Sequence, residues 1–248
     1  IQKIREPEIQ IVSNLSFLPV NENNLVYKAA RLLQEEFALT DGISVKLTKR
    51  IPVAAGMAGG STDAAAMLYA MNQLYDLGLS RRELMKRGVQ IGADVPYCLM
   101  RGTALAEGIG EKLTQLPPMI KCPVLIAKPS ISVSTKFVYQ NLKLDEQTNH
   151  PDIDALMKDI REKDFDGVCA HMGNVLESVT IPNYPVIAEI KQQMMRSGAK
   201  ASMMSGSGPT VFGLFEDGET AKRALREMKR SGLAKQVYLT TIYNNRRK

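Results

Sequence analysis

A loop of small residues carries the most informative chemistry in this sequence. Three glycines, Gly56, Gly59 and Gly60, lie between Pro52 and an alanine-rich segment. Glycine has no Cβ, so backbone N–H groups can approach an anion closely, and the start of a following helix adds free N–H groups and a positive dipole end. The pattern predicts a phosphate site, to which we assign Pro52, Ala54, Ala55, Gly56, Met57, Ala58, Gly59, Gly60, Ser61 and Thr62. The hydroxyls of Ser61 and Thr62 are also candidate ligands for magnesium.

Two common nucleotide-binding patterns do not fit this loop. A Walker A loop requires a lysine after its last glycine, and no lysine follows Gly60. The Gly-x-Gly-x-x-Gly spacing of dinucleotide-binding folds is also missing. From the residues alone, a tight turn before a packing helix is therefore an equal alternative to a phosphate site.

Two further segments carry candidate groups. Asp94 supplies a carboxylate that can accept a proton. Its alternative is a turn residue, with Pro96 favouring an extended backbone before it. Gly206–Ser207–Gly208 predicts a hairpin turn between two short strands, and a backbone contact to substrate is equally compatible with it. Lys46, Lys49 and Arg50 flank the first loop and are expected to be solvated surface charges, with help in holding ATP by Lys49 or Arg50 as the alternative.

The elements that must position these residues alternate between helix and strand. Asn24 is expected to cap a helix that extends to Phe37, Ser61 to begin a helix that ends near Gly78, and Ser80 to precede another. Apolar periodicity predicts strands at 43–47, 103–106, 124–127, 201–205, 210–215 and 237–242, and further helices at 81–89, 151–163, 184–196 and 221–231. The second half follows the order helix, strand, turn, strand, helix, strand, which is typical of an α+β domain with an antiparallel sheet. We expect two domains, 1–129 and 130–248.

Composition narrows the class of protein. The 248 residues are 44% hydrophobic and 23% charged, as in globular proteins, and no apolar run is long enough to cross a bilayer. The net charge of +6 suits an anionic ligand without demanding nucleic acid. Cys98, Cys122 and Cys169 have neither disulfide nor zinc spacing, and with two histidines they predict no metal centre and a cytoplasmic location.

Four segments together resemble the GHMP kinases, the small-molecule kinases of galactose, homoserine and mevalonate. Pro52 to Ala66 is similar to their phosphate loop. Ile91 to Pro96, Gly102 to Glu111 and Met204 to Gly213 resemble, in order and spacing, the catalytic-aspartate segment, the following hairpin and the third glycine-rich motif of the branch named 4-diphosphocytidyl-2-C-methyl-D-erythritol kinases. The resemblance extends over nearly the whole chain.

The resemblance implies a fold and a reaction. It implies an N-terminal ribosomal-protein-S5-domain-2-like lobe and a C-terminal ferredoxin-like lobe, in a monomer or weak homodimer. It also implies transfer of the ATP γ-phosphate, with Mg2+, to the 2-hydroxyl of cytidine-diphosphate-linked methylerythritol. Asp94 is then expected to be the catalytic base. Thr135, Tyr139, Gly206 and Ser207 are expected to join Asp94 in binding substrate, with the Tyr139 ring stacked on cytosine.

The sequence departs from the family at its beginning. The family begins with a strand carrying Lys-x-Asn and a Gly-Tyr-His segment, which the resemblance places beside the catalytic aspartate and the cytidine. The residues from Ile1 to Glu8 do not match either, and Lys3 is not assigned to that role. A polypeptide that began at Ile1 would be expected to show weak or absent turnover, because it lacks a cation that stabilises the transition state.

Three alternatives remain open at this point. The first is another GHMP kinase, acting on homoserine or mevalonate, which the segments around Asp94 and Glu111 disfavour. The second is an inactive relative that only binds ATP. The third is a nucleic-acid-binding module, which would show a steep salt dependence of binding and would give no reason for Asp94 to accompany the glycine loop.

Overall fold

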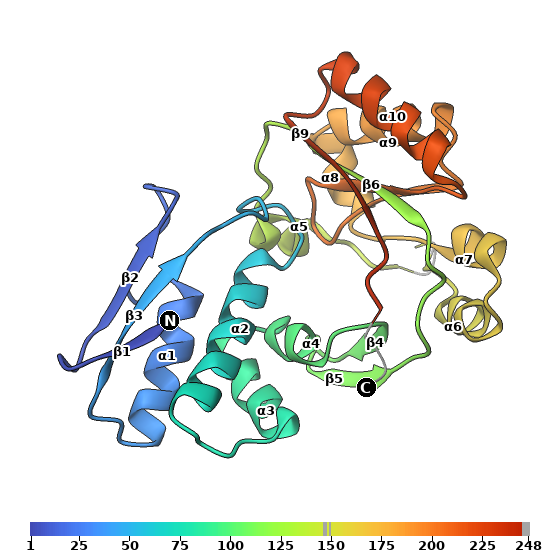
Figure 1. The fold of residues 1–248 in the computed structure, drawn as a ribbon. Coiled ribbons are helices and arrows are strands. Elements are labelled where there is room, and N and C mark those ends of the chain that lie inside the picture. Colours follow the sequence, from blue (N-terminus) through green and yellow to red (C-terminus); the bar gives the residue numbers. More distant parts are fainter. Residues whose placement is uncertain (146–147, 149, 245–248) are drawn as a thin grey trace. The chain divides into compact units, whose positions relative to one another are not determined.

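The computed structural model describes residues 1–145, 148 and 150–244. The chain divides into two units, one formed by Ile1–Val53 with Ala58–Gln115 and the other by Ala54–Met57 with Leu116–Lys248. Both units combine helices with strands (Figure 1), as the α+β prediction requires. The tip of the first glycine loop, Ala54–Met57, therefore groups with the second unit, and the helix that follows the loop groups with the first.

The first unit builds a small sheet covered by helices. Its strands are β1 (Gln2–Ile4), β2 (Ile9–Ser13) and β3 (Gly42–Leu47), with β4 (Ala104–Glu107) and β5 (Lys112–Gln115) forming a separate hairpin. Its helices are α1 (Leu25–Glu36), α2 (Gly59–Leu74), α3 (Arg81–Ile91) and α4 (Val95–Met100). Strands β2 and β3 are parallel and are connected through α1, whereas β1 pairs antiparallel to β3.

Local signals explain where the helices of this unit begin. The Asn24 side chain accepts a hydrogen bond of 2.9 Å from the Val26 N–H, which confirms it as the N-cap of α1. Ser80 and Glu83 form a capping box at α3. Helix α2 begins at Gly59, before the expected Ser61, and ends at Leu74, short of Gly78.

The second unit has the topology of a ferredoxin-like domain. Its strands are β6 (Pro123–Lys128), β7 (Ala201–Met204), β8 (Val211–Leu214) and β9 (Gln236–Thr241), arranged β7-β8-β6-β9 with every pair antiparallel. Its helices are α5 (Thr135–Asn141), α6 (Ile153–Glu162), α7 (Phe165–His171), α8 (Glu177–Asn183), α9 (Val186–Arg196) and α10 (Gly218–Ser231). Helix α9 packs on β7 and β8, helix α10 on β6 and β9, and the two helices contact each other. The ferredoxin-like prediction is confirmed.

The structure has helices α7 and α8 where none was predicted, and two further differences from expectation have a local physical reason. The first is the division of the chain. Strand β6 pairs with β8 and β9, so the second unit begins at Leu116, whereas the sequence suggested a boundary after Pro129. The second is α4, which was not predicted. Pro96 was expected to impose an extended backbone before it, but Val95 starts the helix and Pro96 follows within its first turn, where a missing N–H costs nothing.

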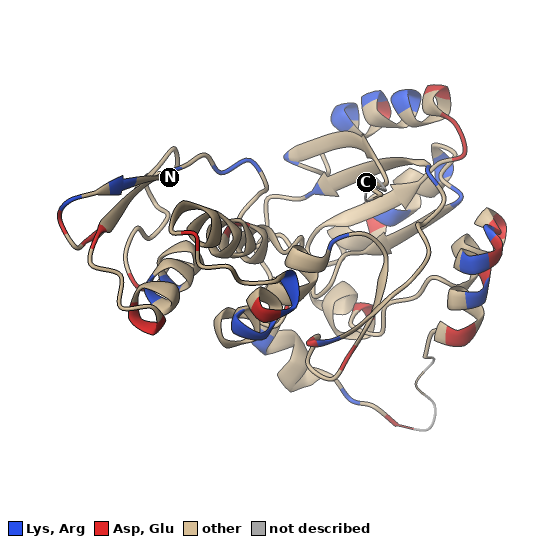
Figure 2. Cartoon of the chain, turned by 60° about the horizontal axis from the view of Figure 1, so that its bottom comes forward, with Lys and Arg blue, Asp and Glu red and all other residues tan. Residues whose placement is uncertain are grey.

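Charged residues of both signs occur on the helices. Figure 2 shows Lys and Arg interspersed with Asp and Glu on the helices of each unit. Within the described part of the chain, no helix is both long and apolar enough to span a bilayer.

Candidate active site

The first glycine loop ends in a helix start that has no side-chain cap. Ala58, the N-cap residue of α2, has a left-handed backbone with φ 47° and makes no capping bond through its side chain. The first backbone bond of the helix runs from the Thr62 N–H to the Ala58 carbonyl at 2.8 Å. By helix geometry, the N–H groups ahead of Thr62 have no intrahelical acceptor. An anion at this helix start would receive them, as the sequence predicts for Gly59, Gly60 and Ser61.

Gly56 joins the tip of this loop to the second glycine turn. The Ser205 hydroxyl donates a 2.8 Å hydrogen bond to the Gly56 carbonyl. A Cβ on Gly56 would lie 2.4 Å from the Ser205 carbonyl oxygen, and its φ of +66° is left-handed. The structure therefore brings together two of the predicted motifs, and the close approach requires glycine at position 56.

Lys49 lies buried beside the start of α2, so the expectation of a solvated surface charge is wrong. Its Nζ is 2.5 Å from Asp63 Oδ2, and the two side chains are 5% and 23% exposed. A Cβ on Gly59 would lie 2.9 Å from the same Nζ. Asn14 fixes the Lys49 backbone by accepting from its N–H at 2.7 Å and donating to its carbonyl at 3.2 Å.

Asp63 and Asn14 are therefore residues that hold Lys49 in place, and the sequence analysis missed both. Asp63 lies within the alanine-rich run after the loop, but no local pattern pairs it with a lysine 14 residues earlier. Together they place the Lys49 ammonium, paired with the Asp63 carboxylate, next to the first turn of α2.

Asp94 is exposed at the start of α4, where its side chain makes no capping hydrogen bond. One turn later, Cys98 Sγ lies 3.4 Å from the hydroxyl of Thr62 on α2. Burial raises the pKa of the Cys98 thiol, and the Asp94 and Asp63 carboxylates raise this pKa further. Helix α4 thus carries Asp94 on an element that contacts the first turn of the phosphate-loop helix.

The substrate-binding candidates of the second unit lie on two elements. The Thr135 hydroxyl, at the start of α5, is 2.9 Å from the Ser207 hydroxyl in the second glycine turn. Tyr139 is 61% exposed on the same helix, while its neighbour Val138 is fully buried. The ring is therefore available to a ligand. Gly206 is exposed, and Ser207 is 7% exposed.

Side chains that precede α8 or lie on it hold this glycine turn and were also missed. Asn174, Glu177 and Thr180 hydrogen-bond to its backbone. No local sequence pattern identifies them, because the backbone groups that they bind lie 27 to 32 residues further along the chain. Among the residues described, no group of three or more His, Cys, Asp or Glu side chains is placed to hold a metal ion.

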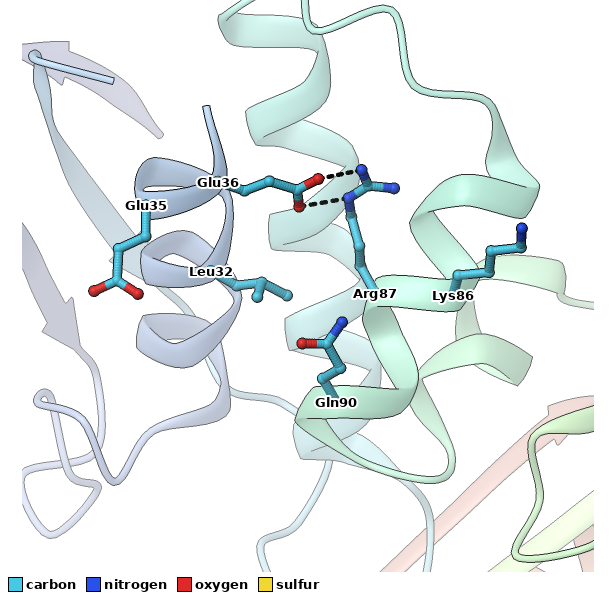
Figure 3. Close-up of a pocket in the computed structure, with 6 residues that line it drawn as sticks. All are labelled: Leu32, Glu35, Glu36, Lys86, Arg87 and Gln90. Carbon is cyan, nitrogen blue, oxygen red and sulfur yellow. Dashed lines mark hydrogen bonds and ion pairs between the residues drawn. The ribbon is translucent and has the colours of Figure 1, made fainter. Parts of the chain in front are cut away.

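A hollow of about 590 Å³ between α1 and α3 contains none of the predicted site residues. Figure 3 shows the Arg87 guanidinium directed from α3 to the Glu36 carboxylate of α1. Arg87 Nε lies 2.7 Å from Glu36 Oε2, and a second bond joins Nη2 to Oε1. This hollow therefore surrounds an ion pair that connects two helices. The residues that line it are Leu32, Glu35, Glu36, Lys86, Arg87 and Gln90.

Two family models match most of this chain. Residues 24–102 match the family model of the GHMP kinases N terminal domain, and residues 156–234 match that of the GHMP kinases C terminal. A protein of Lachnospira eligens named 4-diphosphocytidyl-2-C-methyl-D-erythritol kinase is 58% identical over 241 residues, which are 97% of this chain and 84% of that protein.

Two solved structures show the same fold. A crystal structure of 4-(cytidine 5'-diphospho)-2C-methyl-D-erythritol kinase, 29% identical, covers 95% of this chain and 82% of its own with a TM-score of 0.79. A homoserine kinase from Cytophaga hutchinsonii has a TM-score of 0.82 over 98% of this chain and 84% of its own, but is 21% identical and so supports the fold alone.

Proposed function

Because this chain belongs to the GHMP kinases, in the family of 4-diphosphocytidyl-2-C-methyl-D-erythritol kinases, we propose that it phosphorylates the 2-hydroxyl of that cytidine-diphosphate-linked substrate with ATP. The observation that carries the proposal is the 58% identity to a kinase of that name over 97% of the chain. The exposed, uncapped start of α2 behind the glycine loop is the feature of this structure that fits a triphosphate.

The ATP phosphates are assigned to the first glycine loop and the first turn of α2. Backbone N–H groups from Gly59 to Ser61 donate to phosphate oxygens, and the Lys49 ammonium adds positive charge next to Gly59. Phosphoryl transfer depends mainly on such positioning and charge neutralisation. Mg2+ would add charge neutralisation there, and the Ser61 hydroxyl at the helix start would be its protein ligand.

Asp94 is assigned as the group that accepts the proton of the acceptor hydroxyl. The acceptor 2-hydroxyl oxygen forms a bond to the γ-phosphorus, and the bond between that phosphorus and the β,γ-bridging oxygen breaks to release ADP. The hydroxyl proton passes to the Asp94 carboxylate, which has no capping hydrogen bond to give up.

The acceptor is assigned to the second glycine turn and α5. Gly206, Ser207 and Thr135 contact its diphosphate and sugar alcohol, and the exposed Tyr139 ring stacks on cytosine. A surface that binds a nucleobase favours the cytidine substrate over homoserine and mevalonate, because neither of those contains a nucleobase. We place the enzyme in the cytoplasm, with support from its three free cysteines, and expect a monomer or weak homodimer.

ADP release from Mg-ATP by the full-length protein tests the proposal. We expect release only when the cytidine-diphosphate-linked methylerythritol is added. Homoserine and mevalonate are matched comparison acceptors. Release that is equal with all three, or that requires homoserine or mevalonate, would contradict the assignment.

A further inference from the structure

We infer that Asn174 is a positioning residue for substrate binding, because it sets the orientation of the Gly206–Ser207 peptide. The inference rests on the proposed function, in which this turn contacts the acceptor. Asn174 precedes α8, and its side-chain Nδ2 donates hydrogen bonds of 2.8 Å to both the Met204 and the Gly206 carbonyl oxygens.

The orientation of the Asn174 amide is itself determined. Its Oδ1 accepts a 3.0 Å hydrogen bond from the Leu176 N–H, so Nδ2 must face the two carbonyls. One neutral side chain thus uses its acceptor on its own helix start and its two donors on the glycine turn. An amide does this and a carboxylate of the same shape cannot, because it has no donor.

Peptide geometry gives this contact a consequence for ligand binding. In a trans peptide the C=O and the N–H point in opposite directions. Since the Gly206 carbonyl is held by Asn174, the Ser207 N–H points away from Asn174. Among residues 1–145, 148 and 150–244, the Ser207 N–H has no protein acceptor. It is therefore available to an anionic oxygen of the acceptor.

Neighbouring contacts confine the turn around this peptide. The Glu177 carboxylate accepts from the Met204 N–H at 2.8 Å and pairs with Lys191 through its other oxygen. The fully buried Thr180 donates from its hydroxyl to the Ser207 carbonyl at 3.3 Å. Because these bonds hold the ends of the turn, Asn174 acts on the peptide between them.

The test compares two Asn174 variants with the parent. Asn174→Leu removes both donors without adding charge, and Asn174→Asp keeps the acceptor for Leu176 while removing the donors. The matched control is Asn72→Leu. Asn72 lies in the other unit and is 6% exposed. Its side chain donates to the Leu79 carbonyl and accepts from the Leu79 N–H, each at 2.9 Å. This control costs stability without touching the glycine turn.

We expect both Asn174 variants to speed amide hydrogen exchange in the 204–210 segment and to raise KM for the cytidine substrate about tenfold, with kcat changed less than about twofold. Asn72→Leu should leave the exchange of this segment and the KM for the cytidine substrate unchanged. A KM increase in Asn174→Asp alone would indicate charge repulsion and overturn the inference. Unchanged exchange in both variants, or faster exchange with an unchanged KM, would also overturn it.

The exchange measurement needs no substrate, so it separates this inference from the proposed function. If the parent protein does not turn over the cytidine substrate, the proposed function fails, and the exchange data still decide whether Asn174 holds the turn.

Discussion

Lys49 and Asp63 form an ion pair, with 2.5 Å between Nζ and Oδ2, beside the first turn of the phosphate-loop helix. The lysine side chain is 5% exposed and the carboxylate 23% exposed. Because Gly59 leaves room for the ammonium, the pair is enclosed between the chain after β3 and the start of α2. The ammonium end of the pair therefore lies next to Gly59, at the place that the glycine loop offers to phosphate.

Replacing one member of this pair should destabilise the protein. Removing a partner from a fully buried pair costs about 3–5 kcal/mol. Since Asp63 reaches solvent, we expect Lys49→Met to lower the free energy of unfolding by about 2 kcal/mol, below that range. Urea denaturation measures it. The control is Arg31→Met, which breaks an exposed pair with Glu35 and should cost about 0–0.5 kcal/mol. Equal losses of unfolding free energy in Lys49→Met and Arg31→Met would show that burial of the Lys49 pair does not add to stability.

Gly56 should not tolerate a side chain. Gly56→Ala places a Cβ 2.4 Å from the Ser205 carbonyl oxygen at a φ of +66°. The left-handed backbone alone costs about 1–2 kcal/mol, and displacement of the loop should also raise KM for ATP. Gly218→Ala is the control, because a Cβ there meets no atom within 4 Å. A Gly56→Ala protein with parental stability and KM would show that the loop is not held as described.

Asp94→Asn should remove the proton acceptor and leave the fold intact. Turnover should fall by about 10²- to 10⁴-fold, the usual contribution of a general base. ATP affinity, measured by calorimetry, should stay within about twofold of the parent. Asp76→Asn provides a matched change at a turn residue with φ 50°, which asparagine accepts. Parental turnover in Asp94→Asn would exclude this residue as the base.

Tyr139→Ala should weaken acceptor binding without affecting stability. Loss of one base–aromatic stack is worth about 1–3 kcal/mol, so KM for the cytidine substrate should rise at least about fivefold. Tyr139→Phe keeps the ring and should behave like the parent. Tyr243→Ala removes another exposed ring and serves as the control. An equal KM in Tyr139→Ala and the parent would place cytosine elsewhere.

His171 and Asp159 should make stability depend on pH. The hydrogen bond of 2.6 Å from His171 Nδ1 to the Asp159 carboxylate raises the pKa of His171 above its ordinary value of 6.5. A raised pKa stabilises the fold fully below the unfolded value, and this contribution is lost as pH rises through the folded pKa. The loss of stability caused by Asp159→Asn, relative to the parent, should therefore be larger near pH ~6 than near pH ~9. Denaturation at both pH values checks this, and a pH-independent difference would contradict it.

The parts of the site that depend on neighbouring residues were predictable, and those that depend on distant partners were not. Glycines before an alanine-rich run identify the loop and the start of α2, because both effects act within one helical turn. The backbone of Lys49 is held by Asn14, 35 residues earlier, and its ammonium by Asp63, 14 residues later. Asn174 reaches carbonyls 30 and 32 residues further along the chain.

The same distinction applies to the fold. The alternation of strand and helix in the second half predicted an α+β domain with an antiparallel sheet, whereas the ferredoxin-like class came from the resemblance to the GHMP kinases. The position of β6 in that sheet depends on pairing with β8 and β9, which lie far along the sequence. A short helix such as α4 has too few residues to show a period, and its proline suggested the opposite.

The most direct test of the account is the phosphorus NMR spectrum of the product formed from ATP and the cytidine-diphosphate-linked methylerythritol. We predict one new phosphomonoester signal with no three-bond coupling to hydrogen, because the 2-carbon of the substrate carries a methyl group and no hydrogen. The diphosphate signals should remain. A phosphomonoester signal split by carbon-bound hydrogens would place the phosphate on another hydroxyl, and the absence of a new signal would contradict the proposed reaction.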